Sequence, residues 1–220
     1  MNFSDLIIAI INSISTIAAA IIGAILGGIC TFLMLEHGYR RSKHEENRRI
    51  VLEWAKNERK ASLRGITLKG MDLHNINLSA DKNNNGVDLS SADLRNTDLR
   101  YAILDHANLS HANLSGALLT GANLEYANLS NAIGKNANLD DADLYMADFG
   151  SAIFRRSTFI GAKLMETLFT STDLRCCSFI KADMANANLY DAKLQNAIIS
   201  HSQRDSWITS ERAILPKKFR

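Results

Sequence analysis

Aspartate and asparagine recur at a spacing of five along much of this 220-residue chain, and they are the first residues to consider for chemistry. A carboxylate can serve as a general acid or base, or as a ligand for a hard metal ion. Because side chains repeated so regularly cannot all be catalytic, we expect them to make turn and backbone hydrogen bonds. Each of them precedes a central apolar residue, as do Asp88, Asp93, Asp98, Asn108, Asn113, Asn123 and Asn128.

Other residue types that could do chemistry lack the context that it requires. His106 and His111 are five residues apart, so we expect them on neighbouring faces and pointing outward. The loop DKNNNG, residues 81–86, has neither the alternating carboxylates nor the closing Glu of a calcium-binding EF-hand. The sequence contains no nucleophile-elbow, zinc-protease, P-loop or dinucleotide signature in a suitable context. We therefore predict no enzyme activity, no cofactor and no metal site.

The three cysteines do not form a disulfide framework. Cys176 and Cys177 are adjacent, and Cys30 lies far away in an apolar segment. This pattern indicates a reducing compartment for the part of the chain that holds the pair.

Large apolar residues occur at every fifth position from Leu89 to Ile199, in 23 units of which only Gly134 departs. A period of five fits neither a helix nor a simple strand, so each unit must be a short extended piece followed by a turn. Such a unit can bury its apolar residues only against copies of itself. Two places before each apolar residue lies a small side chain, usually Ala, with the variants Val87, Thr97, Ser157, Thr167, Thr172 and Cys177.

This A(D/N)LXX pattern resembles the pentapeptide-repeat proteins. The resemblance implies an all-β fold, a right-handed four-sided parallel β-helix in which four units form one coil and residues 20 apart stack at ~4.8 Å. Phe154 would then lie over Gly134. Either the ring fills the space that glycine leaves, or the chain bulges locally at Ile133 and Gly134. The roles of the family are diverse, so the fold alone does not give a function.

The five-residue repeat begins before Leu89, and the segment after Ile199 no longer follows it. Leu63, Leu68, Leu73 and Leu78 keep the spacing and predict one more coil before the loop. We assign residues 61–199 to the β-helix, with a loop insertion at 81–86. Residues 200–220 form a predicted C-terminal cap, and the apolar residues that would cover the last coil are Trp207, Ile208, Ile214, Leu215 and Phe219.

Residues 6–35 contain no charged side chain and are long enough for a transmembrane helix. The alternative, a cleaved signal peptide, requires a basic start and a shorter apolar core, and residues 1–5 contain no Lys or Arg. We therefore predict a single-pass anchor in the inner (cytoplasmic) membrane, with residues 1–5 outside the cytoplasm. The positive-inside rule places the repeat domain on the cytoplasmic side, because basic residues follow the segment at Arg40, Arg41, Lys43, Arg48 and Arg49.

Small residues line one face of the predicted anchor, at Ser15, Ala19, Gly23, Gly27 and Thr31. This pattern suits a homodimer of packed helices, although a Gly- and Ala-rich composition also explains it. Residues 36–60 predict a basic juxtamembrane helix and an N-terminal cap, whose apolar cluster from Ile50 to Ala55 would cover the first coil. Residues 36–70 carry ten Lys or Arg and five Glu, a surplus that favours anionic lipid rather than nucleic acid.

Two functions from different classes follow. The first is a non-catalytic, membrane-anchored scaffold that presents the β-helix to a protein partner. The second follows from the resemblance, since some family members regulate DNA gyrase by imitating duplex DNA. Residues 84–199 carry 13 Asp or Glu and nine Lys or Arg, which is a weak negative field for a DNA mimic. We therefore favour the scaffold and expect no nucleic acid partner.

The stacking rule also predicts an interaction surface, because the residue after each apolar position points outward. On one face these residues form a basic stripe, and on the other two faces they form a neighbouring apolar patch. Together the stripe and the patch are a candidate contact with protein or anionic lipid, and the alternative is that the stripe is a solvated face. The stripe contains Arg95, Lys135, Arg155, Arg156 and Arg175, and the patch contains Tyr145, Ile160, Met165 and Ile180.

Overall fold

The computed structural model describes residues 45–53, 63–200, 203, 206 and 213–215. The chain divides into two compact units, Met1–Glu46 and Asn47–Arg220. Of the first unit, only the start of the helix at residues 45–53 is described. The predicted anchor at 6–35 and its ribbon of small residues lie outside the described part. Among the residues that are described, no helix is long and apolar enough to cross a membrane.

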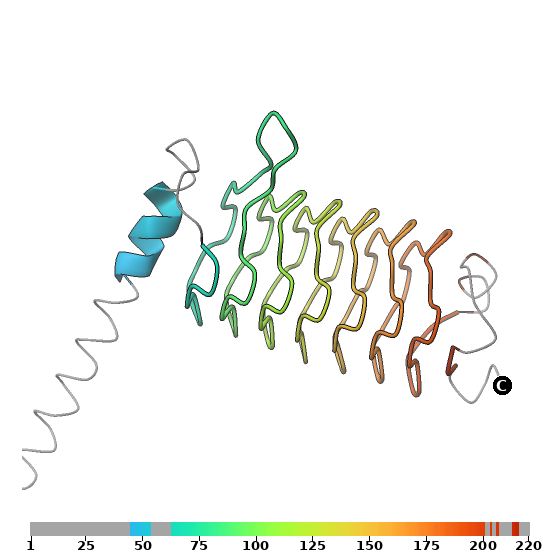
Figure 1. Cartoon of the computed structure of the whole chain (residues 1–220). Helices are drawn as coiled ribbons and strands as arrows, with labels where there is room; N and C mark the ends of the chain where they lie inside the picture. Colours follow the sequence, from blue (N-terminus) through green and yellow to red (C-terminus); the bar gives the residue numbers. More distant parts are fainter. Residues whose placement is uncertain (1–44, 54–62, 201–202, 204–205, 207–212, 216–220) are drawn as a thin grey trace, which may run out of the picture. The chain divides into compact units, whose positions relative to one another are not determined.

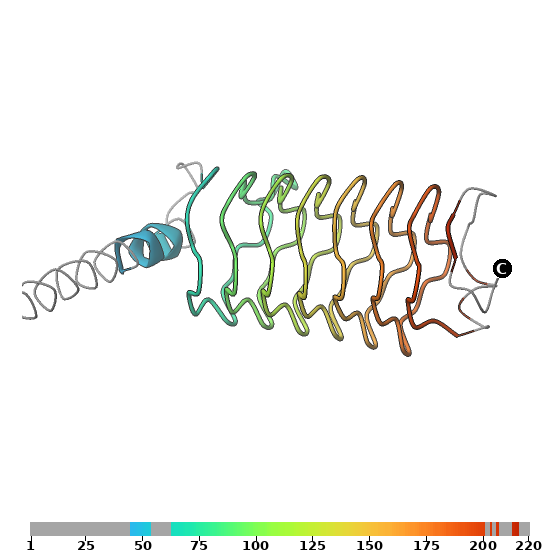
Figure 2. The ribbon, with the colours of Figure 1, turned by 90° about the horizontal axis from the view of Figure 1, so that it is seen from below.

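The second unit is a parallel β-helix, whose successive coils lie side by side in Figures 1 and 2. Its strands are single bridge residues, each at the position before a central apolar residue. Bridges join residues 20 apart on four sides, for example Asp88 to Asn108 and Asp93 to Asn113. The predicted all-β fold and the stacking rule of 20 are therefore confirmed for this unit.

A tight turn closes each described unit from Leu63 to Leu194, except the one at Leu78, which the loop at residues 81–86 follows. The N–H of Ala92 donates to the carbonyl of Leu89 at 3.0 Å, and the same bond recurs five residues on, from Thr97 to Leu94. The third residue of each turn has a positive φ, such as 59° at Ser91, as a type II turn requires. Most of these positions are not glycine, and each costs about 1 kcal/mol or more in backbone strain. The bonds between coils hold the strained corners in place.

The central apolar residues and the alanines fill the interior and are almost completely buried. Gly134 stays in register, because its N–H donates to the carbonyl of Ile153 at 2.8 Å. A Cβ added to Gly134 would overlap the ring of Phe154. The ring thus occupies the space above the glycine, which confirms compensation of volume and excludes the alternative of a bulge.

Hydroxyl and thiol side chains that replace alanine form hydrogen bonds to backbone carbonyls in the interior. The Oγ1 of Thr172 donates to the carbonyl of Phe149 at 2.8 Å, and the Oγ1 of Thr97 donates to that of Leu68 at the same distance. The thiol of Cys177 donates to the carbonyl of Phe154. Burial raises the pKa of that thiol to about 12, so Cys177 stays protonated.

The loop at residues 81–86 interrupts the repeat without breaking the stack. Bridges across it join residues 26 apart, as from Asp72 to Asp98, instead of 20. The loop is therefore a six-residue addition to one corner. Gly86 closes it, since a Cβ there would overlap the backbone carbonyl of His106.

Both ends of the β-helix are covered within the second unit. Val51 of the helix at 45–53 is fully buried in the common core, and Asn47 Nδ2 donates to the carbonyl of Thr67 at 2.6 Å. At the other end, the Nε2 of Gln203 donates to the carbonyls of Phe179 and Ala182. Ile214 then pairs with Lys193, and Leu215 packs partly buried against the core. Trp207, Ile208 and Phe219 lie outside the described residues.

Candidate interaction surface

The outward Asp and Asn side chains hold the turns. The backbone N–H of Ser110 donates to Asn108 Oδ1 at 3.1 Å, and that of Ser90 donates to Asp88 Oδ1 at 3.0 Å. The bond recurs in most of the described units that have Asp or Asn at this position. Their predicted role in turn and backbone hydrogen bonding is confirmed, and these oxygens are already engaged.

The predicted basic stripe is partly neutralised. Arg95 forms an ion pair with Asp93, with Nη2 and Oδ2 2.7 Å apart. The hydrogen bonds from Arg95 hold the pKa of the Asp93 carboxyl below its usual value. The side chain of Lys135 has neither a hydrogen bond nor an ion pair within the described part of the chain. The stripe is thus a mixture of paired and unpaired cations rather than a uniform row.

Asp173 organises the other end of the stripe. Its side chain is only 9% exposed, and it receives Arg155 Nε at 2.5 Å. Arg175 binds the same carboxylate with two nitrogens, Nε at 2.9 Å and Nη2 at 2.8 Å. Two guanidinium groups therefore share one carboxylate, and Arg156 stands at the adjoining corner. We call these four residues the arginine cluster.

A shallow depression of about 260 Å³ opens beside the arginine cluster. The Oε1 atom of Gln195, which lines it, is buried and has no hydrogen-bond partner among the described residues. Cys176 is exposed there, whereas Cys177 next to it is buried. The lining residues are Arg155, Arg156, Arg175, Cys176, Gln195 and Asn196.

The predicted apolar patch divides between two sides of the β-helix. Ile160 and Ile180 lie on one side, where Ile180 is exposed and Ile160 is half-buried. The N–H of Ile160 donates to Asp140 Oδ1 at 2.9 Å, so a carboxylate borders this part. Tyr145 and Met165 lie on the next side. The four residues thus occupy two sides of the β-helix, as the stacking rule of 20 predicts.

Tyr145 and Met165 belong to a larger aromatic surface that the sequence did not predict. The ring of His106 stacks on Tyr126 with centroids 4.8 Å apart, and Tyr126 meets Tyr145 edge-to-face at 5.6 Å. Tyr126 is 44% exposed, Met146 40% and Met165 36%. The nearby carboxylate of Glu166 raises the pKa of Tyr145, which shows that an acid borders the rings. We name this surface the aromatic corner, and it comprises His106, Tyr126, Tyr145, Met146 and Met165.

A second depression, of about 500 Å³, lies where the last coil ends. Gln203 forms part of its wall and is anchored by the carbonyls described above. The depression is lined by Ile180, Lys181, Ala182, Ile198, Ile199, Ser200 and Gln203.

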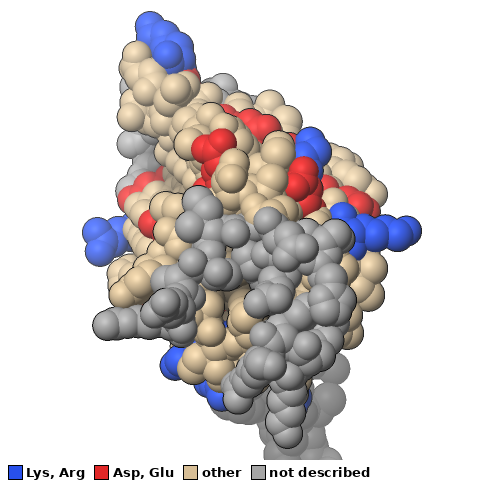
Figure 3. Space-filling model, turned by 90° about the vertical axis from the view of Figure 1, so that its right-hand side faces the viewer, with Lys and Arg blue, Asp and Glu red and all other residues tan. Residues whose placement is uncertain are grey.

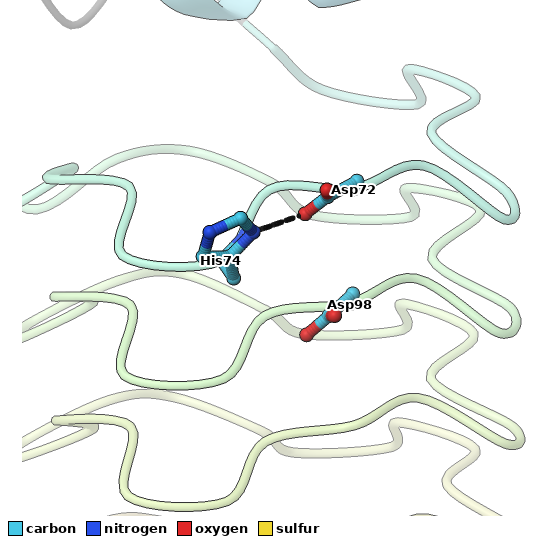
Figure 4. Close-up of side chains that lie close together, drawn as sticks. All are labelled: Asp72, His74 and Asp98. Atoms are coloured by element: carbon cyan, nitrogen blue, oxygen red, sulfur yellow. Dashed lines mark hydrogen bonds and ion pairs between the residues drawn. The ribbon is translucent and has the colours of Figure 1, made fainter.

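One group of potential metal ligands gathers near the loop, on the first two coils (Figure 4). The ligand atoms of Asp72, His74 and Asp98 lie within 4.8 Å of one another. His74 Nδ1 is 2.5 Å from Asp72 Oδ1, and this hydrogen bond lowers the pKa of Asp72. Arg100, however, already binds both oxygens of Asp98, at 2.9 Å and 2.7 Å. A divalent cation would have to displace this guanidinium, so the group fits an ion-pair network better than a metal site.

Charges of both signs surround the β-helix. Figure 3 shows acidic side chains gathered in the upper part of the view, and basic side chains at the top, at both sides and at the lower edge. Within the described coils, no outward row has acids on more than two successive coils.

The Asp–Arg pairs join residues of one unit, and the stacked rows that predict the basic stripe do not reveal them. The triplet Asp-Leu-Arg places both charged side chains outside, two residues apart, and it occurs at 93–95, 98–100 and 173–175. That spacing is readable from the sequence. The contact between Arg155 and Asp173 comes from a neighbouring coil and requires the exact stacking geometry.

Comparisons with known proteins agree with this geometry. Residues 85–121, 117–156, 135–170 and 162–200 match a family profile described as pentapeptide repeats in eight copies. No curated protein sequence matches the chain. Full-length QnrB1, a plasmid-mediated fluoroquinolone resistance protein, is 18% identical with a TM-score of 0.51, covering 70% of this chain and 79% of its own. Rfr23, a pentapeptide repeat protein from the cyanobacterium Cyanothece 51142, is 22% identical with a TM-score of 0.49, covering 74% and 96%.

Proposed function

Because this chain belongs to the pentapeptide-repeat family, we propose that it is a non-catalytic module that binds a protein partner on the outside of its β-helix. The polar residues of its repeats serve the turns and the ion pairs, which leaves the outward apolar residues as the distinctive surface. Large apolar side chains gathered on a water-facing surface are typical of a contact site.

The aromatic corner is the observation that supports this proposal. Its two tyrosines and two methionines come from neighbouring coils, and Tyr126 and Met146 are substantially exposed. Tyrosine and methionine are enriched in protein interfaces, and methionine adapts its shape to a partner. Glu125 and Glu166 lie beside the aromatic corner, close enough to raise the pKa of Tyr145, and give it an acidic rim. The matching partner therefore presents an apolar surface flanked by Lys or Arg.

Site-specific photo-crosslinking in cells tests this proposal. A photoreactive phenylalanine analogue replaces Met146, which is exposed in the corner, or Ser130 on a side with small polar residues as the matched control. We expect a defined crosslinked product from position 146 only, and its loss when Tyr126→Ser is added. Equal labelling from both positions, or labelling that survives Tyr126→Ser, would contradict the role of the corner.

The membrane anchor is a further part of the proposal. The uncharged segment at 6–35 and the basic residues that follow it support a module held at the inner face of the cytoplasmic membrane. A reporter fused after Arg220 should be active only on the cytoplasmic side. Activity on the opposite side would reverse the orientation.

The alternative is a DNA-mimicking regulator of a topoisomerase such as gyrase. A DNA mimic needs long rows of acids, and here Arg95 and Arg100 neutralise two of the carboxylates. We therefore place the alternative second. A supercoiling assay with purified gyrase distinguishes the two, since inhibition or protection at stoichiometric amounts of the protein would reverse this order.

A further inference from the structure

The arginine cluster differs from the other Asp–Arg pairs in its charge balance. Asp93 and Asp98 each face one arginine of their own unit, at 2.7 Å in both cases. Asp173 instead faces two arginines, and Arg156 adds a third cation at the corner. A surface that gathers like charges without matching acids repels itself and attracts anions.

Neighbouring coils add to this imbalance. Lys135 lies one coil before Arg155 at the same outward position, and Lys193 pairs through its backbone with Asp173. In the stacked rows that hold the arginine cluster, Asp173 is the only acid between residues 133 and 196, and Asp93 lies further along the same row. Over that stretch these rows carry five basic side chains and one carboxylate, and the carboxylate is itself nearly buried.

The shared carboxylate also fixes the direction of the guanidinium groups. Arg155 uses Nε to bind Asp173, and its two Nη atoms have no hydrogen-bond partner in the described structure. Arg175 uses Nε and Nη2, which leaves Nη1 available. Guanidinium groups held in this way can bind an oxyanion through two parallel N–H donors, and little side-chain entropy remains to be lost.

The size of the depression limits what it can hold. Pockets for drug-sized ligands are roughly 300–1,000 Å³, and this one is about 260 Å³ and open to solvent. It therefore suits one charged group with a small attached moiety.

We propose that this depression binds the oxyanion of a phosphate monoester, through Arg155, Arg156 and Arg175. A phosphate monoester carries close to two negative charges and three acceptor oxygens at neutral pH. This matches three guanidinium groups whose single carboxylate is already engaged. The ligand is either a small soluble phosphate monoester or a lipid headgroup of the same chemistry, and it binds independently of the aromatic corner.

Cys176 provides a reporter inside the site. It is exposed in the depression, whereas Cys177 is buried with a pKa of about 12 and stays unreactive. Full-length protein is treated with N-ethylmaleimide, and modification of each cysteine is followed by peptide mass spectrometry. We expect glycerol phosphate to slow modification of Cys176, inorganic phosphate to slow it less, and chloride at equal ionic strength to leave it unchanged. Equal effects of all three salts would overturn the proposal.

Matched variants distinguish a specific phosphate-binding site from non-specific electrostatic attraction of anions to the basic stripe. Arg155→Gln with Arg156→Asn removes two donors, and Asn suits the positive φ of 61° at position 156. Arg175 still pairs with Asp173, so the fold is retained. We expect this variant to weaken glycerol phosphate binding at least about tenfold by isothermal titration calorimetry. Arg100→Gln, which removes one charge from the balanced pair with Asp98 in another row, should bind like the wild type; equal weakening by both variants would reject the site.

Vesicles distinguish the two sources of the phosphate. Phosphatidate carries a monoester and phosphatidylglycerol a diester, and each is mixed with phosphatidylcholine. If the source is lipid, phosphatidate vesicles protect Cys176 while soluble glycerol phosphate protects it only weakly; the reverse assigns a soluble ligand. Equal protection by both anionic lipids shows a simple charge effect and contradicts a monoester site.

Discussion

Two parts of the same β-helix fill their interior with different side chains. In residues 87–126, the leucine coils, every central apolar residue is leucine. In residues 147–186, the phenylalanine coils, five of the eight are phenylalanine, and their rings contact one another with centroids 5.0–6.4 Å apart. The backbone bridges of both parts keep the same interval of 20 residues. The hydrogen-bonded ladder therefore sets the dimensions of a coil, and side-chain volume is redistributed between coils to fit it.

The two parts also differ in their small residues. In the leucine coils, Thr97 is the one polar residue among the buried small positions, whereas the phenylalanine coils hold Ser157, Thr167, Thr172 and Cys177. These side chains donate to turn carbonyls of the preceding coil. A buried hydroxyl is acceptable in either part because the turn supplies an acceptor at a fixed position.

The largest loss of stability should appear when one large buried side chain is removed from each part. Phe154→Ala should lower the free energy of unfolding by about 3–5 kcal/mol, and Leu114→Ala by about 2–5 kcal/mol. Phe154 also fills the space over Gly134, so its loss leaves the larger cavity and should give the larger effect. Urea unfolding of the full-length chain, followed by circular dichroism, measures both. Equal or reversed effects would mean that the coils relax to fill the cavity.

The exchange of side-chain volume between neighbouring coils can be tested directly at the stacked positions Gly134 and Phe154. Gly134→Leu should cost about 1–3 kcal/mol, because the new side chain overlaps the Phe154 ring. Combining it with Phe154→Leu recreates the leucine stack of the first part. We expect the double variant to be more stable than the sum of the single changes by about 1 kcal/mol or more in a double-mutant cycle. Simple additivity would refute compensation between these positions.

The buried hydroxyls should contribute equally in both parts. Thr172→Val and Thr97→Val each remove one hydrogen bond of 2.8 Å with little change of volume. Each should cost about 1 kcal/mol, since the acceptor carbonyls keep their turn hydrogen bonds. The same unfolding experiment compares them. A much larger cost at Thr172 would show that the aromatic surroundings strengthen the bond.

The smallest effect is expected at the surface, where Asp93 pairs with Arg95. Hydrogen bonds from Arg95 lower the pKa of Asp93 from its ordinary 3.8, so the pair stabilises the fold fully above that pH. The contribution is lost as the pH falls through the lowered pKa. Arg95→Gln should therefore reduce stability at pH 7, and its difference from the wild type should vanish in strong acid. A difference independent of pH would exclude the ion pair as the cause.

The repeat was readable from the sequence because its period is strict and each unit must bury the same two positions. The stack of Phe154 on Gly134 followed from counting 20 residues, and the turn role of Asp88 or Asn108 followed from their position before leucine. The aromatic corner was not predicted in full. It joins residues one and two places after leucine, and their side-chain directions at a strained corner are set by φ rather than by residue type. The sharing of Asp173 by two coils depends on side-chain reach in the same way.

The loop at residues 81–86 offers a place to lengthen the chain. Asp81 Oδ1 accepts the N–H groups of Asn83 and Asn85, at 2.8 Å and 3.0 Å, so the loop closes on itself. The bridges on either side continue with an interval of 26 residues. Doubling the length of a flexible loop costs only about 0.6 kcal/mol in closure entropy. A peptide tag or a fluorescent reporter inserted between Asn83 and Asn84 should therefore be carried at this corner while the coils before and after it stay stacked.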